Sequence, residues 1–505
     1  MLFIHIVLIV FLHSFQNSIS MLCPIIKYRN LFCHKWTSKF FSMSCAKKNS
    51  VKKSSVIKPQ NILNLHKRGL LEDIFPNASV SLPEQLLKQQ CFYCGFDPTS
   101  DSLHIGNLMS LMLLLHCQRA GHNVIAVIGN ATARIGDPSD QTKDRNSVST
   151  DVLDKNTKGL INCITNIFET HEQEHYIHRG VKELPTIKIL NNYDWYRDIN
   201  VVDFFANAGR KFRMGPMLDK RFVKERLNSS EGLLLPEFLY QVYQAYDWLH
   251  LLQNYNCRFQ FGGSDQLGNM NAGRYLIDRV TQQEVYGLLT PLITTHTGQK
   301  VGKTAGNAVW LDADKTSPFE FYQYFLRQRD ADVEKFLKYF TFIELTNIKE
   351  IMQEHSRYPE RRNAQKILAK NVCKLVHGEE GLKSAERCTQ VLFHGQLEQL
   401  ENLTDQEIDA TFKGMKIHHA VLEPTTTIYD IATKIKAIPD GLIGIEAINK
   451  GGVLVNGIAM QNSQQILLCD FHVLKNDLSL ITVGKKNHHI VRWRVPDDMY
   501  QVSAK

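Results

Sequence analysis

Apolar and polar residues alternate in distinct blocks between residues 82 and 129. The block lengths predict four elements, namely a short helix over 82–90, a buried strand over 91–96, a helix over 108–117 and a strand over 124–129. A strand, a polar loop, a helix and another strand form a βαβ unit, which requires a parallel sheet. The predicted fold class is therefore α/β, with a doubly wound, Rossmann-like parallel sheet that binds its ligand at the carboxyl ends of the strands.

The pattern changes further along the chain. Pro236 opens about four helical turns without a breaker, residues 259–266 predict a strand and a glycine turn, and 291–304 predict a strand that enters a flexible loop. Helix formers then dominate, and short β-branched runs return near the C-terminus. We predict four parts: a leader at 1–71, the α/β domain at 72–317, an α-helical domain at 318–415 and a small α+β domain at 421–505.

Charge separates the leader from the rest. The chain carries a net charge of +8, yet residues 1–71 hold eleven Lys or Arg and no Asp or Glu. Such a segment is typical of a mitochondrial transit peptide, which predicts the matrix as the destination. The apolar run at 2–12 resembles a secretory signal core but lacks a preceding basic residue, and it is too short to span a membrane, so no membrane association is expected. Met21 opens a more usual transit sequence, so both Met1 and Met21 remain possible starts.

The eleven cysteines are scattered and odd in number. Cys91 and Cys94 have the spacing of a zinc pair, but no second Cys or His pair follows at the distance that a structural zinc site requires. We therefore predict reduced cysteines, no metal site and no tightly bound cofactor.

Two loops carry candidate chemistry. DPTSDSLHIGN at 97–107 places His104 and Gly106 at the start of a helix, where free backbone N–H groups and the positive end of the dipole attract an anion. Two lysines flank a glycine in KVGKT at 300–304, and they can stabilise charge on phosphorus as pyrophosphate leaves. Taken singly, the first loop also fits a casual histidine at a surface helix, and the second a solvated hairpin.

Together the loops resemble the paired signature of class I aminoacyl-tRNA synthetases, with Asn107 in place of the second histidine of His-Ile-Gly-His and with a contracted lysine loop. Five ordered segments are similar to the tyrosyl-tRNA synthetase family: YCGFDPTSDSLHIGN at 93–107, IGDPS at 135–139, YQVYQAYD at 240–247, GGSDQLGN at 262–269 and KVGKTAGNAVWLD at 300–312. The similarity is strongest over about 80–312. It implies ATP-dependent activation of L-tyrosine to tyrosyl-adenylate and transfer to the 3' end of tRNA(Tyr) in mitochondrial translation.

Tyr240, Gln244 and Asp247 are spaced so that one helical face presents all three. Alone, such a stripe fits an ordinary amphipathic face equally well. The resemblance implies that Tyr93 and Asp247 bind the substrate phenol, and that Tyr240, Gln244 and Asp137 bind its ammonium group. A buried donor and acceptor built for a hydroxyl can reject phenylalanine by roughly 10⁴- to 10⁵-fold without editing.

The resemblance assigns the remaining positions to ATP and to catalysis. The implied catalytic residues are Thr99, His104, Lys300, Lys303 and Thr304. The implied ATP-binding residues are Asp97, His104, Gly106, Asn107, Asp265 and Lys303, while Gln266 contacts the tyrosyl group. Mg²⁺ is expected to accompany the substrate ATP. No protein nucleophile is needed, because the tyrosine carboxylate attacks the α-phosphate and a ribose hydroxyl of the tRNA then attacks the adenylate.

RNA contacts are predicted in both C-terminal parts. Basic and apolar residues recur at helical intervals over 361–378, which fits a solvated helix face or, by resemblance, an anticodon-side helix. Residues 421–484 look like an alpha-L RNA-binding fold, in which the candidate phosphate contacts are Lys450, Lys485 and Lys486. The resemblance also implies a symmetric homodimer, with an insertion at about 150–235 in the interface.

Two positions depart from the family pattern. Gln141 stands where a lysine is common, and Leu267 where a tryptophan is common. Two other functions also remain open from the sequence. The scaffold would suit an RNA chaperone or intron-splicing factor, or another enzyme that transfers an adenylyl group.

Overall fold

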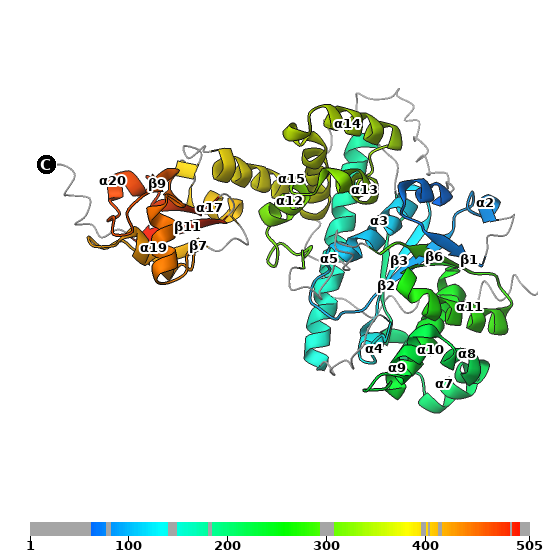
Figure 1. The fold of residues 1–505 in the computed structure, drawn as a ribbon. Coiled ribbons are helices and arrows are strands. Elements are labelled where there is room, and N and C mark those ends of the chain that lie inside the picture. Colours follow the sequence, from blue (N-terminus) through cyan, green and yellow to red (C-terminus); the bar gives the residue numbers. More distant parts are fainter. Residues whose placement is uncertain are drawn as a thin grey trace, which may run out of the picture. The chain divides into compact units, whose positions relative to one another are not determined.

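The computed structural model describes most of the chain that follows the first 61 residues. The described residues are 62–76, 82–139, 149–179, 184–292, 308–394, 400–401, 404–412, 417–484 and 487–494. Figure 1 follows the chain through its sheets and helices. Within these ranges, every helix is too short or too polar to cross a bilayer.

Six strands form the sheet in the first part of the fold. They are β1 Asp73–Phe75, β2 Cys91–Phe96, β3 Asn123–Ile128, β4 Lys188–Asn191, β5 Phe259–Gly263 and β6 Tyr286–Thr290. Their order is β1-β6-β5-β2-β3-β4, with β2 to β6 parallel and β1 antiparallel to β6. The chain builds β3 and β4 on one side of β2 and then β5 and β6 on the other. The α/β prediction is confirmed, and the strand order reverses between β2 and β5.

The strands predicted over 91–96 and 124–129 are confirmed to within one residue. The strand predicted over 291–304 does not begin at residue 291, because β6 ends at Thr290, and residues 293–304 lie outside the described residues. Pro291 directly follows Thr290, and proline has no N–H group to donate to a sheet ladder.

Helices cover both faces of this sheet, because successive strand residues point to opposite faces. Phe92 and Cys94 pack in one core with α3 (Ile105–Arg119) and α5 (Thr150–Arg179), whereas Tyr93 packs in another with α10 (Leu235–Tyr255) and α11 (Leu267–Thr281). The other elements of this part are η1 Ile62–Arg68, α2 Leu82–Gln85, α4 Asn130–Ala133, α6 Tyr193–Tyr196, α7 Val201–Asn207, η2 Gly209–Lys211, α8 Met214–Leu218, α9 Arg221–Leu227 and η3 Ser264–Gln266.

Residues 62–71 belong to the folded body. Their apolar side chains are buried in the same core as α3. Arg68 is only 7% exposed, and its guanidinium donates to four backbone carbonyl groups, those of Leu337, Lys338, Thr341 and Ile343. The predicted leader at 1–71 therefore includes ten residues that the structure places in the fold. The stretch without Asp or Glu therefore continues into residues whose apolar side chains are buried in the fold.

We expect Arg68→Ala to lower the free energy of unfolding by about 3 kcal/mol, because four carbonyl groups lose a charged donor. Exposed Lys67 next to it provides a matched control, and Lys67→Ala should change the stability by less than about 0.5 kcal/mol. Urea unfolding followed by circular dichroism measures both variants. Equal midpoints for the two variants would contradict the bracing role of Arg68.

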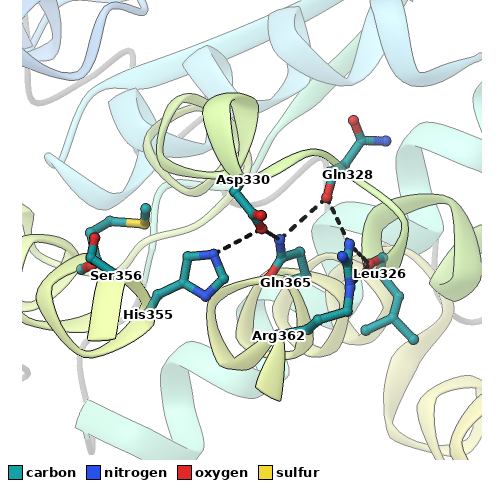
Figure 2. Close-up of polar contacts among 8 residues, drawn as sticks. Leu326, Gln328, Asp330, His355, Ser356, Arg362 and Gln365 are labelled. Atoms are coloured by element: carbon teal, nitrogen blue, oxygen red, sulfur yellow. Dashed lines mark hydrogen bonds and ion pairs between the residues drawn. The ribbon is translucent and has the colours of Figure 1, made fainter. Parts of the chain in front are cut away.

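The helices predicted beyond residue 318 are confirmed. They are α12 Pro318–Leu326, α13 Asp330–Phe340, α14 Leu345–Arg357, η5 Pro359–Arg361, α15 Asn363–His394 and α17 Asp405–Thr411. Figure 2 shows a polar cluster that ties the turn between α12 and α13 to α14 and α15. Asp330 Oδ1 accepts from Gln365 at 2.6 Å and lies 3.0 Å from His355 Nε2. Arg362 donates to the backbone carbonyl of Gln328 at 2.8 Å.

A second sheet forms the C-terminal part. Its strands are β7 Ile417–Val421, β8 Val453–Val455, β9 Ile458–Met460, β10 Leu478–Val483 and β11 Asn487–Arg494, in the order β7-β11-β10-β8-β9. Three helices accompany it: α18 Ile428–Lys434, α19 Leu442–Asn449 and α20 Cys469–His472. Most of these elements share one hydrophobic core. The first strand begins at residue 417, four residues before the predicted start of this domain.

Candidate active site

A pocket of about 540 Å³ lies at the carboxyl ends of the strands, where the strand order reverses between β2 and β5. All the described residues that were predicted to bind tyrosine, to bind ATP or to take part in catalysis line it. They are Tyr93, Asp97, Thr99, His104, Gly106, Asn107, Asp137, Tyr240, Gln244, Asp247, Asp265 and Gln266. The fold thus collects four of the five sequence segments around one cavity.

A buried carboxylate, that of Asp247 on α10, forms part of the wall. Its Oδ2 accepts from Asn192 Nδ2 at 3.1 Å, and its Oδ1 accepts from Trp195 Nε1 at 2.9 Å. Burial raises the pKa of Asp247 to about 6, although the hydrogen bonds from Asn192 and Trp195 act in the opposite direction. The carboxylate is therefore held in place by two donors and is ionised at neutral pH.

Tyr93 on β2 lies close enough to Asp247 for its pKa to respond to that charge. Burial raises the pKa of the Tyr93 phenol first, and the charge of Asp247 raises it further. The Tyr93 hydroxyl is buried and has no hydrogen-bond partner among the described residues. A buried unpaired polar group is costly. The unpaired hydroxyl near a carboxylate therefore suits a ligand that both donates and accepts a hydrogen bond.

A second carboxylate, that of Asp97, follows β2 directly. Its Oδ2 accepts from the Tyr240 hydroxyl and its Oδ1 from the Thr132 hydroxyl, each at 2.8 Å. Gly129 is required beside it, since a Cβ atom there would lie 1.9 Å from Asp97 Oδ1. Two residues that were predicted for different ligands, Asp97 for ATP and Tyr240 for the amine, thus share a hydrogen bond.

The third carboxylate belongs to Asp137. Its Oδ2 accepts from Gln266 Nε2 at 2.6 Å, and its Oδ1 accepts from the Ser139 backbone N–H at 2.9 Å. After burial, the charges of all three carboxylates raise the pKa of Tyr240. The Tyr240 hydroxyl therefore lies in a negatively charged part of the pocket, which attracts an ammonium group.

His104 marks the start of α3 at the pocket. Its backbone N–H donates to Asn107 Oδ1 at 3.1 Å, and the Asn107 N–H donates to the His104 carbonyl at 2.8 Å. The residue that replaces the second histidine of the class I signature therefore caps the helix through its side chain. The positive end of the α3 dipole meets the pocket at Gly106, where negatively charged groups are stabilised.

The loop at 97–104 is held against α5. Asn156 of α5 donates to a backbone carbonyl of the loop at 2.9 Å. Gly159 of the same helix permits close approach, because a Cβ atom there would lie 2.0 Å from the Asp101 carbonyl oxygen. The Asp101 carboxylate also forms an ion pair with Lys315, and this contact lowers its pKa. The loop is thereby fixed from two sides.

The sequence also singled out positions besides these pocket residues. Lys300, Lys303, Thr304, Lys485, Lys486 and Gln141 lie outside the described residues. Lys450 is exposed on the C-terminal part, and its ammonium pairs with Glu446 Oε1 at 2.6 Å. Leu267 begins α11 and is 39% exposed.

Among the pocket or supporting residues that were not predicted from the sequence are Thr132, Asn192, Trp195 and Gln260. Asn192 directly follows β4 and Trp195 lies on the next helix, α6, so both lie near the edge of the sheet that carries the predicted loop. Gln260 is a lone polar residue in the apolar strand β5, and its Oε1 is buried without a partner among the described residues. This polar side chain within an apolar strand is the sequence feature that could have identified Gln260 as a site residue.

The described residues contain no group of three or more His, Cys, Asp or Glu side chains placed to hold a metal ion. Cys91 and Cys94 are buried free thiols. Burial raises the pKa of Cys94, which lines the pocket, to about 12, so this thiol is protonated and a weak nucleophile at neutral pH. The pocket therefore offers carboxylates, hydroxyls, amides and a helix terminus for binding and charge stabilisation.

Comparison with known proteins agrees with this geometry. The family model for class I tRNA synthetases (W and Y) matches residues 87–394. The mitochondrial tyrosine–tRNA ligase of Drosophila melanogaster is 48% identical over 439 residues, which cover 86% of this chain and 95% of the relative. That of Homo sapiens is 47% identical over 433 residues, covering 84% and 90%. The crystal structure of a C-terminally truncated Aspergillus nidulans mitochondrial tyrosyl-tRNA synthetase is similar with a TM-score of 0.59 and 32% identity, and the match covers 65% of this chain and 93% of that one.

Proposed function

The chain belongs to the class I tRNA synthetases of the tryptophan and tyrosine type, and within them to the tyrosine–tRNA ligases. From this membership we propose how the pocket carries out the reaction. It is a mitochondrial aminoacyl-tRNA ligase that activates tyrosine with ATP and transfers it to tRNA. One observation carries the proposed chemistry: the buried, ionised carboxylate of Asp247 shares the pocket with the unpaired hydroxyl of Tyr93.

We propose that the substrate phenol donates to Asp247 and accepts from Tyr93. Gln260 is opposite Tyr93 in the pairing of β2 with β5, so it can add a contact from the neighbouring strand. Phenylalanine would leave the carboxylate and the hydroxyl without a partner, which supports strong discrimination between the two amino acids. The substrate ammonium would bind among Tyr240, Gln244 and Asp137, where the charges of Asp97, Asp137 and Asp247 raise the pKa of Tyr240 and would favour a cation.

ATP would occupy the part of the pocket at the start of α3. We assign its phosphates to Thr99 and His104, its adenosine to Gly106 and Asn107, and its remaining contacts to Asp97 and Asp265. Gln266, hydrogen-bonded to Asp137, would contact the tyrosyl group. Lys300, Lys303 and Thr304 would bind the leaving pyrophosphate. Mg²⁺ would enter with ATP and be held chiefly by its phosphates and water.

The proposed reaction has two displacement steps. The tyrosine carboxylate attacks the α-phosphorus, and the bond to pyrophosphate breaks. A terminal ribose hydroxyl of the tRNA then attacks the tyrosyl carbonyl, and AMP leaves. The protein supplies positioning and hydrogen-bond donors at the points where negative charge develops.

Tyrosine-dependent exchange of pyrophosphate into ATP, followed by charging of mitochondrial tRNA, tests this proposal. We expect exchange with tyrosine, very little with phenylalanine, and transfer to tRNA(Tyr). Absence of exchange would overturn the proposal and return attention to an RNA chaperone or splicing role. Exchange without charging would favour a different adenylyl-transferring enzyme.

We propose that the two C-terminal parts bind tRNA. The helical domain at 318–415 would face the anticodon side, and the domain at 421–505 would contact phosphates through Lys450, Lys485 and Lys486. The exposure of Lys450 on α19's C-terminal side supports its assignment. The acid-free leader supports import into the matrix.

We further propose a homodimer that uses the insertion at about 150–235. Helices α7, α8, α9 and α10 share a small core of their own. Yet large apolar side chains remain exposed on these helices and between them, namely Val201, Val202, Phe205, Met214, Leu218, Leu227, Leu234 and Leu235. Val202 is 70% exposed and Leu235 is 68% exposed. This concentration of exposed apolar residues supports an interface with a second copy.

Val202→Asp is expected to weaken the dimer at least about 100-fold, because a charge would be buried in the apolar interface. Sedimentation equilibrium over a range of protein concentrations measures the shift toward monomer. Val421→Asp, at a valine that is 47% exposed on β7, is the control and should leave the dimer intact. An unchanged dimer in Val202→Asp would place the interface elsewhere.

A further inference from the structure

We propose that Trp310, held in place by Lys315 and Asp101, is a positioning residue that orients His104 for adenylate formation. The inference rests on the proposed function, because it assumes that His104 contacts ATP. It concerns Trp310, Lys315 and Asp101, for which the motif resemblance implied no role.

The backbone carries the first observation. His104 and Trp310 form an isolated antiparallel β-bridge. On one side of it the Ile105 N–H donates to the Val309 carbonyl at 3.0 Å, and on the other the Leu311 N–H donates to the Leu103 carbonyl at 2.8 Å. Two backbone hydrogen bonds therefore flank His104 and attach the start of α3 to a segment about 200 residues later in the chain.

The side chains carry the second observation. The indole ring of Trp310 lies 6.2 Å from the imidazole of His104, with the ring planes tilted by 60°. The Lys315 ammonium lies 4.9 Å above the Trp310 ring centroid and forms an ion pair with Asp101. Asp101 stands three residues before His104. One lysine thus bridges the loop that leads to His104 and the ring that faces it.

The backbone of this segment is held as well. The Trp310 N–H donates to Thr316 Oγ1 at 3.0 Å, so the turn that carries Lys315 folds back onto Trp310. Trp310 also belongs to the fifth sequence motif, KVGKTAGNAVWLD, whereas His104 belongs to the first. A contact between them joins two motifs that each carry proposed ATP-binding residues.

This arrangement has a consequence for the reaction. His104 can stabilise charge on the phosphates only if its ring is held in the productive orientation, and displacement by about 1 Å can cost roughly 10²-fold in rate. Trp310 and Lys315 lie outside the residues that line the pocket. Their loss should therefore lower kcat and leave tyrosine binding largely unchanged.

The test uses Trp310→Leu and Lys315→Met in the full-length chain, with tyrosine-dependent exchange of pyrophosphate into ATP as the assay. We expect each variant to lower kcat about tenfold, with the KM for tyrosine changed less than twofold. Lys315→Arg keeps both the ion pair and the cation over the ring, and it should restore most of the activity. The matched control is Lys338→Met, because Lys338 is exposed to the same degree as Lys315 and pairs with Glu334. That control should retain wild-type kcat.

A double-mutant cycle separates positioning from a general structural role. In a His104→Ala background, adding Trp310→Leu should cost less than twofold, because the residue through which Trp310 acts is gone. Additive losses would overturn the inference, as would wild-type kcat in both single variants. If Trp310→Leu strongly lowers the thermal unfolding midpoint, Lys315→Met replaces it in the double-mutant cycle. Failure of the wild-type chain to catalyse exchange with tyrosine would instead refute the proposed function itself.

Discussion

Asp247→Ala is expected to lower kcat/KM for tyrosine in pyrophosphate exchange by about 10²- to 10³-fold. The substitution removes the acceptor proposed for the substrate phenol. It also removes the acceptor of the Trp195 indole N–H, now at 2.9 Å, and one of the two acceptors of the Asn192 amide, now at 3.1 Å. Removing one member of a buried charged hydrogen-bond network costs about 3–5 kcal/mol. Steady-state exchange kinetics measure the loss.

Phenylalanine distinguishes recognition of the phenol from general damage. Because phenylalanine cannot use Asp247, the preference for tyrosine over phenylalanine should fall by at least about 100-fold in the variant. Asp278→Ala, at an exposed position on α11, should keep both the activity and the preference. Equal losses for tyrosine and phenylalanine would contradict the assignment of Asp247 to the phenol.

The same carboxylate should impose a pH dependence. Burial raises the pKa of Asp247 to about 6, so the group is ionised above that pH and protonated below it. A protonated carboxyl group is a weaker acceptor for the phenol and for the two donors that hold it. The KM for tyrosine should therefore be flat above about pH 7 and rise as the pH falls from 6 to 5. Asp247→Asn, which does not titrate, should lack this rise.

Hydrophobic patterns in the sequence predicted which strands and helices form better than they predicted where each one begins and ends. The apolar blocks of β2 and β3 were clear because both strands are buried on two faces, and such strands have few polar interruptions. The helix expected to start at 108 begins at Ile105 instead. The capping hydrogen bonds of His104 and Asn107 add a turn that hydrophobicity alone does not mark.

The predicted site had a different limit. Tyr93 and Asp247 were predicted as site residues because each lies within one of the sequence motifs. Asn192 and Trp195 were not predicted, because their place near the site depends on β4 lying beside β3. The strand order is a property of the whole sheet, and no local sequence pattern shows it. Arg68 shows the same limit, since its carbonyl partners follow it by about 270 residues. Contacts over such separations are set by packing.

Gly159→Ala follows from such a long-range contact, and it is expected to lower kcat for pyrophosphate exchange by about 10²-fold. Alanine inside a helix normally stabilises by about 1 kcal/mol relative to glycine. Here its Cβ would lie 2.0 Å from the carbonyl oxygen and 2.9 Å from the carbonyl carbon of Asp101. Both are backbone atoms, so the loop that carries Thr99 and His104 must shift, and a shift of about 1 Å is enough for the expected loss.

The kinetic pattern makes this prediction specific to the loop. Tyr93 lies on β2 and Asp247 on α10, so the KM for tyrosine should change much less than kcat. Lys158→Ala, at the exposed neighbouring position of α5, introduces the same side chain without approaching the loop and should keep wild-type kinetics. Wild-type kcat in Gly159→Ala would mean that the loop tolerates displacement, and that α5 does not set the position of the proposed ATP-binding residues.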